Sequence, residues 1–376
     1  MNADTLTEFA KRVLNHLLEP WSSWENFSFA ISAGARTFRD FTSEFGWPYL
    51  LSTLALMGVL FVLGRRNRTI DGGSFLNFAC PRNIYRHPSA ILDYKFAAIN
   101  SSTDLLLVAP LITGISLLVY NVTVHVFSGP WSLKDTFTSH HIATTVALLS
   151  QLLILGDFVY FISHYLMHKV PFLWTFHQVH HSAEVLTPIS VARVHPVERL
   201  FQAIVRALCG GVGTGLYTSA SDVHVSIGTL FGVNIVLFFF LSFAYNLRHS
   251  HIWLSYGPVL SWVLVSPAQH QIHHSREPKH LDKNFGLVFS FWDAAFGSLY
   301  IPQTRESLKY GLAGVPQGKF ATVQQLYFTP LVEASHILLH APYRYFVKAQ
   351  DKIKTSRILE LRARLRWLGN RTQAQR

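Results

Sequence analysis

The sequence predicts an all-α integral membrane protein. Of the 376 residues 49% are hydrophobic and only 14% are charged, whereas soluble domains have about 25% charged residues. The mean hydropathy is +0.24. Five apolar stretches also approach the ~20 residues that a helix needs to cross a bilayer. They are residues 47–64, 104–127, 142–162, 200–217 and 223–245.

Lysine and arginine counts predict how these stretches are oriented. Residues 1–46 contain scattered acids. They do not show the basic start, apolar stretch and small-residue cleavage site that are typical of a signal peptide, so we expect an attached, non-cytoplasmic N-terminal segment. Residues 65–100 are rich in arginine, whereas 128–141 contain only Lys134. The positive-inside rule therefore places residues 65–100 in the cytoplasm. The two last stretches, of which 200–217 is interrupted by Arg206, are expected to form a hairpin.

Eight histidines form three clusters with the spacing of metal ligands. On a helix, residues four apart share one face, and the last histidine of an HxxHH motif lies about 100° around the axis, where its ring can reach a neighbouring ion. Eight nitrogen donors exceed the four that a tetrahedral zinc ion takes, which favours a dinuclear site. The clusters are His164 and His168; His177, His180 and His181; and His270, His273 and His274.

The predicted topology brings the three clusters to one side of the membrane. The stretch 142–162 ends just before His164, and the hairpin returns the chain to the same side before the third cluster. A b-type cytochrome would place single histidines within facing spans, and a zinc protease would need HExxH, which is absent. A metal transporter or sensor remains an alternative, although transport sites lie near the membrane midplane.

Four motifs resemble the fatty acid hydroxylase/sterol desaturase superfamily over residues 100–300. They are DFVYFISHYLMH at 157–168, HQVHH at 177–181, RVHPVE at 193–198 and the segment 270–300, which ends with NFG and WDAAFG. The resemblance implies a helical membrane bundle with a cytoplasmic, histidine-rich di-iron cap. It also implies two iron ions and O2, which oxidise a lipid C–H bond.

The resemblance extends the ligand set and leaves the reaction open. The eight clustered histidines become iron ligands, and a further ligand is implied at His249, with His251 as ligand or neighbour. His195 is another candidate, because Pro196 would stop a helix and fix the approach of the ring. We expect hydroxylation of a sterol, a fatty acyl chain or a related lipid, with desaturation at the same site as the alternative.

Two acids and a turn are expected to support the ligands. Asp157 lies seven residues before His164, on the same helical face, and should accept the second ring proton of a bound histidine. An acid within a membrane span is a functional candidate by default. Asp293 is expected to act in the same way or to pair with an arginine. Asn284 and Gly286 are expected to shape a turn.

The electrons are expected to come from a separate protein. No dinucleotide-binding fingerprint follows a predicted strand; Gly211, Gly213 and Gly215 fit close helix packing better. The HPGG signature of a fused cytochrome b5 domain is also absent. A ferredoxin, cytochrome b5 or reductase partner is therefore implied, with a lipid substrate in the membrane and no nucleic acid. Bacterial inner membrane and endoplasmic reticulum fit equally well.

The chain is expected to divide into four parts. Residues 1–46 precede the membrane, 47–103 hold the first span and a basic loop, and 104–300 form the catalytic membrane domain. Residues 301–376 form a basic, cytoplasmic helical region in which ten lysines and arginines follow residue 340. This tail could bind anionic lipid or form a solvated helix.

Overall fold

The computed structural model describes residues 17–32, 47–69, 73–127, 141–220, 244–315 and 318–340, together with Lys11, Leu14, Asn15 and Ser242. Within these residues the fold is helical and has no β-strand, only an isolated bridge between Leu264 and Phe289. The all-α prediction is thus confirmed for this part of the chain. The expected loop 128–141, most of the stretch 223–245 and the basic tail after residue 340 lie outside it.

The helices follow the apolar stretches and continue beyond them. In chain order the main ones are α2 (Trp24–Ile31), α4 (Trp47–Arg66), α5 (Phe75–Ala79), α6 (Arg82–Tyr85), α7 (Pro88–Thr103), the π-helical η2 (Asp104–Val108), α8 (Ala109–Phe127), α9 (His141–Lys169), α10 (Pro171–His181), η4 (Pro188–Ala192), α11 (Pro196–Ala220), η5 (Tyr245–Leu247), α13 (Gly257–Leu260), α14 (Pro267–His273), η6 (Pro278–His280) and α15 (Phe291–Phe296).

Three helical segments among the described residues are long and apolar enough to cross a membrane. They are Trp47–Arg66, Pro88–Phe127 and Pro196–Ser219, so three of the expected spans have counterparts. The second is longer than expected, because α7, η2 and α8 run on without a break through residue 104. The stretch 142–162 lies within α9.

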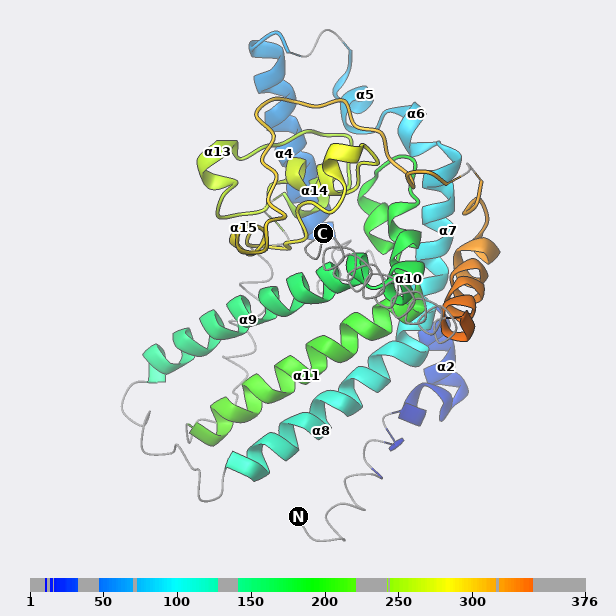
Figure 1. The fold of residues 1–376 in the computed structure, drawn as a ribbon, viewed down its shortest axis with the longest axis vertical. Helices are drawn as coiled ribbons and strands as arrows, with labels where there is room; N and C mark the ends of the chain where they lie inside the picture. Colours follow the sequence, from blue (N-terminus) through cyan, green and yellow to red (C-terminus); the bar gives the residue numbers. More distant parts are fainter. Residues whose placement is uncertain are drawn as a thin grey trace, which may run out of the picture.

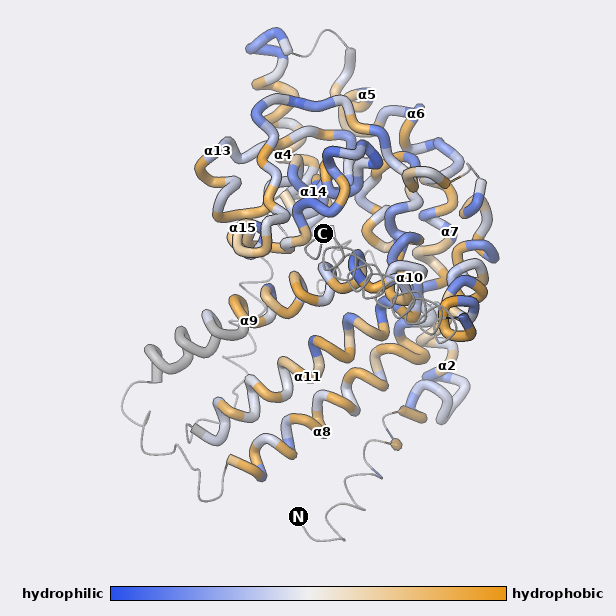
Figure 2. The backbone as a smooth tube through the Cα atoms, viewed as in Figure 1, coloured by the Kyte–Doolittle hydropathy of each residue, from blue (hydrophilic) through white to orange (hydrophobic). Residues whose placement is uncertain are grey.

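Helices α8, α9 and α11 lie side by side as one slanted layer (Figure 1), whose described parts are largely apolar (Figure 2). Small residues bring α8 and α11 together. A Cβ atom on Gly211 would lie 2.8 Å from Cβ of Val119, and one on Gly215 would lie 2.6 Å from Cβ of Thr123. Only glycine allows this approach, as expected for small residues spaced four apart at a helix interface. The prediction of close packing is confirmed for these two glycines.

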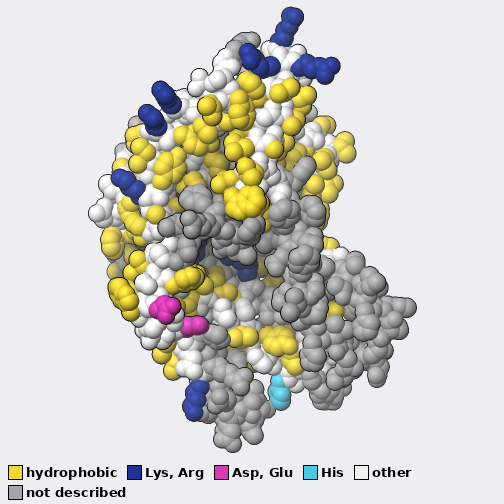
Figure 3. All heavy atoms as spheres, turned by 180° about the vertical axis from the view of Figure 1, so that it is seen from behind, with side chains coloured by type: hydrophobic (Ala, Val, Ile, Leu, Met, Phe, Trp, Pro, Cys, Tyr) yellow, Lys and Arg dark blue, Asp and Glu magenta, His cyan; other side chains and the backbone are white. Residues whose placement is uncertain are grey.

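Helix α4 packs one face against the segment that precedes the third histidine cluster and leaves the other exposed. Met57 is buried with Leu247 and Ile252, whereas Leu51, Val59 and other large apolar side chains of α4 are exposed. The face opposite that of Figure 1 shows many hydrophobic side chains among its described atoms, with lysines and arginines along its upper edge (Figure 3). An apolar surface on a long helix is typical of contact with lipid.

Candidate metal centre

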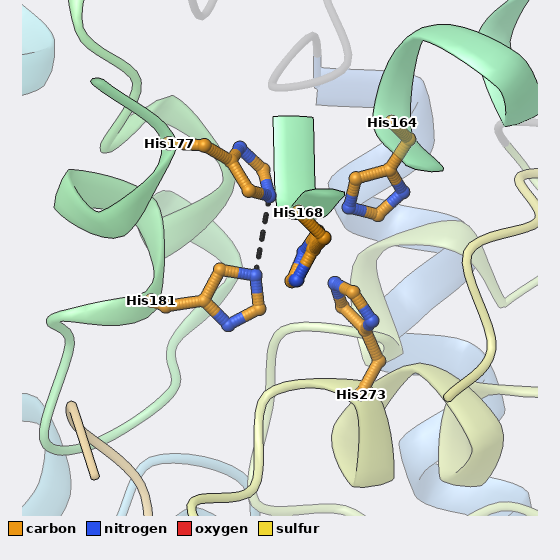
Figure 4. A group of neighbouring side chains, drawn as sticks. All are labelled: His164, His168, His177, His181 and His273. Carbon is orange, nitrogen blue, oxygen red and sulfur yellow. Dashed lines mark hydrogen bonds between the residues drawn. The ribbon is translucent and has the colours of Figure 1, made fainter. Parts of the chain in front are cut away.

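Nine buried or nearly buried histidines form two adjacent groups at the end of the α8–α9–α11 layer. In each group, one nitrogen per ring lies within 4.8 Å of the corresponding nitrogens of the others. In Figure 4 the rings of the first group point toward a common centre. The first group is His164, His168, His177, His181 and His273, and the second is His180, His249, His270 and His274.

The local sequence of each cluster places the rings on the required faces. His164 and His168 lie one turn apart in the last part of α9. In α10, His177 and His181 share a face and join the first group, while His180 lies on another face and joins the second. The motif is divided between two groups as expected, but the prediction that the last histidine reaches the second ion is wrong: the middle one, His180, does so. Residues four apart differ by only about 40° around the axis, so His177 and His181 stay together.

Helix α14 divides its histidines in the complementary way, because His273 joins the first group whereas His270 and His274 join the second. Its start is defined by a capping box between Ser266 and Gln269, in which each side chain bonds the other's backbone N–H. The cap holds the first turn of α14 and hence the direction in which its histidines point.

Backbone carbonyls orient two rings of the first group. Nδ1 of His164 lies 2.8 Å from the carbonyl oxygen of Phe285, and Nδ1 of His273 lies 2.8 Å from that of Lys283. A carbonyl can only accept, so each Nδ1 carries the ring proton and each Nε2 presents its lone pair. Both Nε2 atoms are buried without a hydrogen-bond partner among the described residues. Metal-bound histidines are typically held in this way.

Glu198, in the first turn of α11, orients a third ring. Its Oε1 atom lies 2.7 Å from Nδ1 of His177, and both side chains are only 2% exposed. Gln202, one turn further along α11, donates from Nε2 to the same oxygen at 3.1 Å. Sequence reasoning missed Glu198, although the motif RVHPVE contains it. An acid in the first turn of an otherwise apolar helix was the available signal.

The Nε2 atoms of the second group face one another at short distances. Nε2 of His249 lies 3.3 Å from that of His180, 3.1 Å from that of His270 and 3.0 Å from that of His274. Ligands about 2.0–2.1 Å from a metal lie about 2.8–3.4 Å from one another, for octahedral or tetrahedral angles. The four nitrogens therefore have the spacing of ligands around one ion. His249 was the favoured additional ligand, and it lies within this group.

Burial keeps the rings in the form that binds metals. Removal from water lowers the pKa of His249 and of His273 to about 3. It also lowers the pKa of His181 and of His274 well below the usual 6.5, with the neighbouring rings adding to the effect. A neutral imidazole has a lone pair for a cation, so the donor set fits two transition-metal ions, with up to five nitrogens for one and four for the other.

The segment 283–293 forms the support of the first group. Asn284 has φ of 57°, a left-handed conformation that asparagine tolerates, and its amide bonds the backbone of Gln269 and Tyr300. At Gly286 a Cβ would lie 2.6 Å from the carbonyl oxygen of Phe289, so no larger residue fits. The predicted turn at Asn284 and Gly286 is present, and it presents the carbonyls that orient His164 and His273.

Asp293 holds this turn through backbone groups and pairs with no arginine among the described residues. Its carboxylate accepts hydrogen bonds from N–H of Phe285 at 2.7 Å, N–H of Gly286 at 2.9 Å and the hydroxyl of Ser298 at 2.6 Å. The residue is fully buried, and this burial raises the pKa of its carboxyl group. Asp293 therefore supports the ligands through the turn, without contacting a histidine.

The prediction that Asp157 accepts a proton from a histidine ligand is wrong. Its carboxylate accepts from N–H of Val288 at 2.7 Å, N–H of Phe289 at 3.1 Å and Nε1 of Trp292 at 3.0 Å. The helical register does place Asp157 on the face of His164, but the backbone that follows the turn provides the hydrogen-bond donors for its carboxylate. Asp157 thus links α9 to this chain segment. Glu198 has the role that was predicted for Asp157.

His195 and His251 lie outside both groups. Nε2 of His195 is 3.0 Å from the carbonyl oxygen of Tyr327, and its Nδ1 accepts from N–H of Val197 at 3.1 Å. Nε2 of His251 is 2.7 Å from the carbonyl oxygen of Phe78. Each ring joins two segments of the chain, so neither is retained as a ligand. His251 is two residues from His249, but its ring contacts the backbone of Phe78 and does not join the second group.

A cavity of about 580 Å³ lies between α9, α11 and the histidines. Leu153, Val159 and other apolar side chains form much of its wall. At one end it reaches His177 of the first group and His180, His249 and His270 of the second. The volume is in the range of small-molecule sites. One wall of the cavity is α11, which is a candidate membrane span. An apolar molecule in this cavity would lie against the metal ligands at its end.

Residues 149–298 match the family described as fatty acid hydroxylase. No solved structure matches the chain significantly.

Three relatives illustrate the range of similar proteins. An alkylglycerol monooxygenase of Xenopus tropicalis is 29% identical over 159 residues, which are 42% of this chain and 31% of the relative. The ornithine lipid hydroxylase OlsE of Rhizobium tropici is 27% identical over 46% of this chain and 48% of its own length. A cholesterol 25-hydroxylase-like protein of Danio rerio is 28% identical over 40% of this chain and 55% of its own length. The chain thus spans between about a third and about half of the length of these relatives.

Proposed function

Since residues 149–298 match the fatty acid hydroxylase family, we propose that this chain is a membrane-bound, di-iron monooxygenase that hydroxylates a C–H bond of a lipid. The observation that supports this most is the pair of buried imidazole groups at one end of an apolar cavity. Relatives named as monooxygenases and hydroxylases of lipids support the reaction class.

The chemistry of the substrate favours iron over zinc. An alkyl chain has no acidic proton, electrophilic centre or leaving group, so acid–base and nucleophilic catalysis have nothing to act on. A metal that only polarises bonds has the same limitation. A pair of redox-active ions bound by the two histidine groups would supply the activation of O2. The balance for hydroxylation is RH + O2 + 2e⁻ + 2H⁺ → ROH + H2O, and an external protein donor supplies the electrons.

The protein's own residues would position the ions and the lipid. Carbonyls of Lys283 and Phe285 and the carboxylate of Glu198 hold three rings of the first group. Apolar side chains along α9 form part of the cavity wall, and an alkyl chain in contact with them would be removed from water. Which carbon lies nearest the two groups then decides the position of oxidation.

We further propose that the site faces the cytoplasm and takes electrons there. All three clusters meet in one site, which agrees with the hairpin topology. Helix α4 ends at Arg65 and Arg66, and the positive-inside rule assigns this end of the helix to the cytoplasm. Single cysteines at residues 67 and 279 should react with an impermeant maleimide only from the cytoplasmic side. Labelling from opposite sides would refute this orientation.

The test of function combines metal analysis with lipid mass spectrometry. Cells expressing the wild type under ¹⁸O2 should form a lipid 18 Da heavier than its precursor, and the purified protein should contain two irons per chain. His177→Ala should lose the product and at least one iron, whereas His251→Ala, a matched histidine outside both groups, should keep both irons. A product 2 Da lighter would indicate desaturation. Zinc alone, with no O2 consumed, would refute the proposal and favour metal transport or sensing.

A further inference from the structure

An apolar lobe of the chain lies beside α9. It consists of residues 257–264, which include α13, and residues 289–296, which include α15. Residues 249–275 contain no lysine, arginine, aspartate or glutamate, and residues 284–304 contain only the buried Asp293. A large exposed apolar surface marks contact with lipid or with a partner. The large apolar side chains that the lobe exposes are Val259 (82%), Leu260 (44%), Trp262 (55%), Val263 (48%) and Phe296 (48%).

The lobe packs against the second half of α9. The ring centroid of Trp292 lies 4.8 Å from that of Phe158, and the ring centroid of Phe296 lies 5.0 Å from that of Phe161. Nε1 of Trp292 also donates to Asp157. Figure 1 shows α15 between α9 and α13. The lobe therefore adjoins the layer of helices that contains α11, a candidate membrane span.

Backbone contacts join the two halves of the lobe. Leu264 and Phe289 form an antiparallel bridge, and N–H of Ser290 donates to the carbonyl of Val263 at 3.0 Å. N–H of Phe289 in turn donates to the carboxylate of Asp157 on α9. The exposed side chains of residues 259–263 are therefore held close to the same part of α9 as α15.

The position of Asp157 along α9 gives the depth of the lobe. Near the metal centre, Sδ of Met167 lies 3.8 Å from Nε2 of Gln202 on α11. Asp157 is ten residues before Met167, which is about 15 Å further from the metal centre along α9. Helices α9 and α11 lie side by side (Figure 1), and Asp157 and Gly210 of α11 line the same cavity. Asp157 and the lobe attached to it are thus level with the interior of the candidate span on α11.

Both ends of the α13 segment return to the metal centre. His249 precedes the segment and His270 follows it, and their Nε2 atoms lie 3.1 Å apart in the second histidine group. Residues 250–269 therefore leave this group and come back to it. A segment with this path cannot cross a membrane, although its apolar tip can enter one.

The backbone of the lobe meets the requirement of apolar surroundings. In hydrocarbon every polar backbone group needs a partner within the protein. N–H of each residue from Ser261 to Val265 donates to a backbone carbonyl. The carbonyl of Ser261 accepts from Nε2 of Gln269 at 3.0 Å and from the hydroxyl of Ser290 at 2.8 Å. This irregular segment can therefore lie in lipid without leaving these groups unpaired.

We propose that the lobe is a re-entrant element, which enters the membrane beside α9 and returns to the side of the metal centre, with Val259, Trp262 and Val263 in contact with lipid acyl chains. The inference rests on the membrane location in the proposed function and adds that part of the site's support lies within the membrane. Val288, which adjoins the lobe, lines the cavity. The lipid around the lobe is thus next to the cavity that receives the substrate.

Spin labelling of the full chain in phosphatidylcholine nanodiscs tests this without turnover. Cys80→Ser and Cys209→Ser remove the two native cysteines, and a nitroxide is attached to Val259→Cys or to Val263→Cys. Electron paramagnetic resonance then measures collisions of the label with O2, which enters lipid, and with a polar nickel chelate, which stays in water. Thermal unfolding of each labelled variant shows that the fold is kept.

Two other positions calibrate the measurement. Leu281 is 49% exposed and Val263 is 48% exposed, but Leu281 lies outside the lobe and next to charged residues in the sequence. Leu281→Cys should therefore report water. Leu118 is exposed at the middle of α8, within the candidate span Pro88–Phe127, so Leu118→Cys should report lipid.

We expect the ratio of O2 to nickel collisions to be about tenfold higher at Val259 and Val263 than at Leu281, because a polar complex is costly to transfer into hydrocarbon. The ratio should approach that at Leu118. Nickel collisions at Val259 and Val263 as frequent as at Leu281 would overturn the proposal, since the lobe would then face water. Rare collisions with both reagents would also overturn it, because protein would then cover the lobe.

These outcomes are separate from failure of the proposed function. A water-exposed label at Leu118 would show that α8 does not span the membrane and would refute the proposed function together with the lobe. Labels in lipid at Val259 and Val263, in a protein that oxidises no lipid, would refute the monooxygenase and leave the re-entrant lobe intact. An active monooxygenase with a water-exposed lobe would do the reverse.

Discussion

Glu198→Ala should weaken the binding of one metal ion and spare the other. The substitution removes the acceptor 2.7 Å from Nδ1 of His177, in a place where both side chains are 2% exposed. A hydrogen bond to a charged group contributes about 1.5–3 kcal/mol. Loss of such a partner to a metal-bound histidine typically reduces affinity about 10–100-fold, or about 1.4–2.8 kcal/mol. The two ranges agree.

The assay is a competition titration of metal-free protein with Fe²⁺ and a chelator, which resolves two binding steps. We expect a 10–100-fold weaker step for the first group, which contains His177, and a second step within twofold of the wild type. Glu198→Gln keeps an oxygen acceptor and should lose less than tenfold. Glu184→Ala, an exposed glutamate just after α10, is the control. If Glu198→Ala binds both ions as the wild type does, Glu198 does not orient His177 and the reasoning fails.

Three other perturbations have defined outcomes. Asp293→Ala leaves two backbone N–H groups buried without their acceptor, so the free energy of unfolding in detergent should fall by about 3 kcal/mol; a loss below about 1 kcal/mol would contradict the role of the turn. Gly215→Ala should destabilise the protein by about 1–3 kcal/mol, because the new Cβ meets α8 at 2.6 Å. Gly210→Ala meets nothing within 4 Å, and equal thermal shifts of the two variants would refute the packing argument. In metal-free protein, burial lowers the pKa of His249 and of His273 to about 3, so the unfolded chain takes up protons below pH 6.5 that the folded one does not. Stability is thus fully present above pH 6.5 and falls toward pH 3, by up to about 1.4 kcal/mol per pH unit for each ring; thermal midpoints unchanged between pH 7.5 and pH 5 would exclude this.

The histidine groups show how far spacing alone can predict a site. Residues three and four apart on a helix have defined relative directions, so it could be predicted before any fold was known that each HxxHH motif serves two ions. Which histidine separates was predicted wrongly, because in both motifs the middle one, His180 or His273, joins the other group. The agreement depends on α10 and α14 being regular helices. For His195 and His251 no such regularity existed, because they lie in irregular segments where the direction of a side chain depends on its partners in space.

The partners of the acids could not be predicted from spacing. Asp157 and His164 share a face of α9, yet the chain at Val288 and Phe289 provides the donors for Asp157. Glu198 reaches His177 across 21 positions of sequence. A carboxylate forms the hydrogen bonds that the assembled fold offers it, and those depend on how α9, α10 and α11 pack.

The sequence by itself determined the helical, apolar character of the protein, the families of lipid-oxidising enzymes that it resembles and the histidines that lie close together. These properties depend on composition and on helical periodicity, which are local. Only the tertiary structure decided which carbonyls and which carboxylate orient the rings, and which two histidines lie apart. Those relations join segments that are distant in the chain, and packing alone brings them within hydrogen-bonding distance.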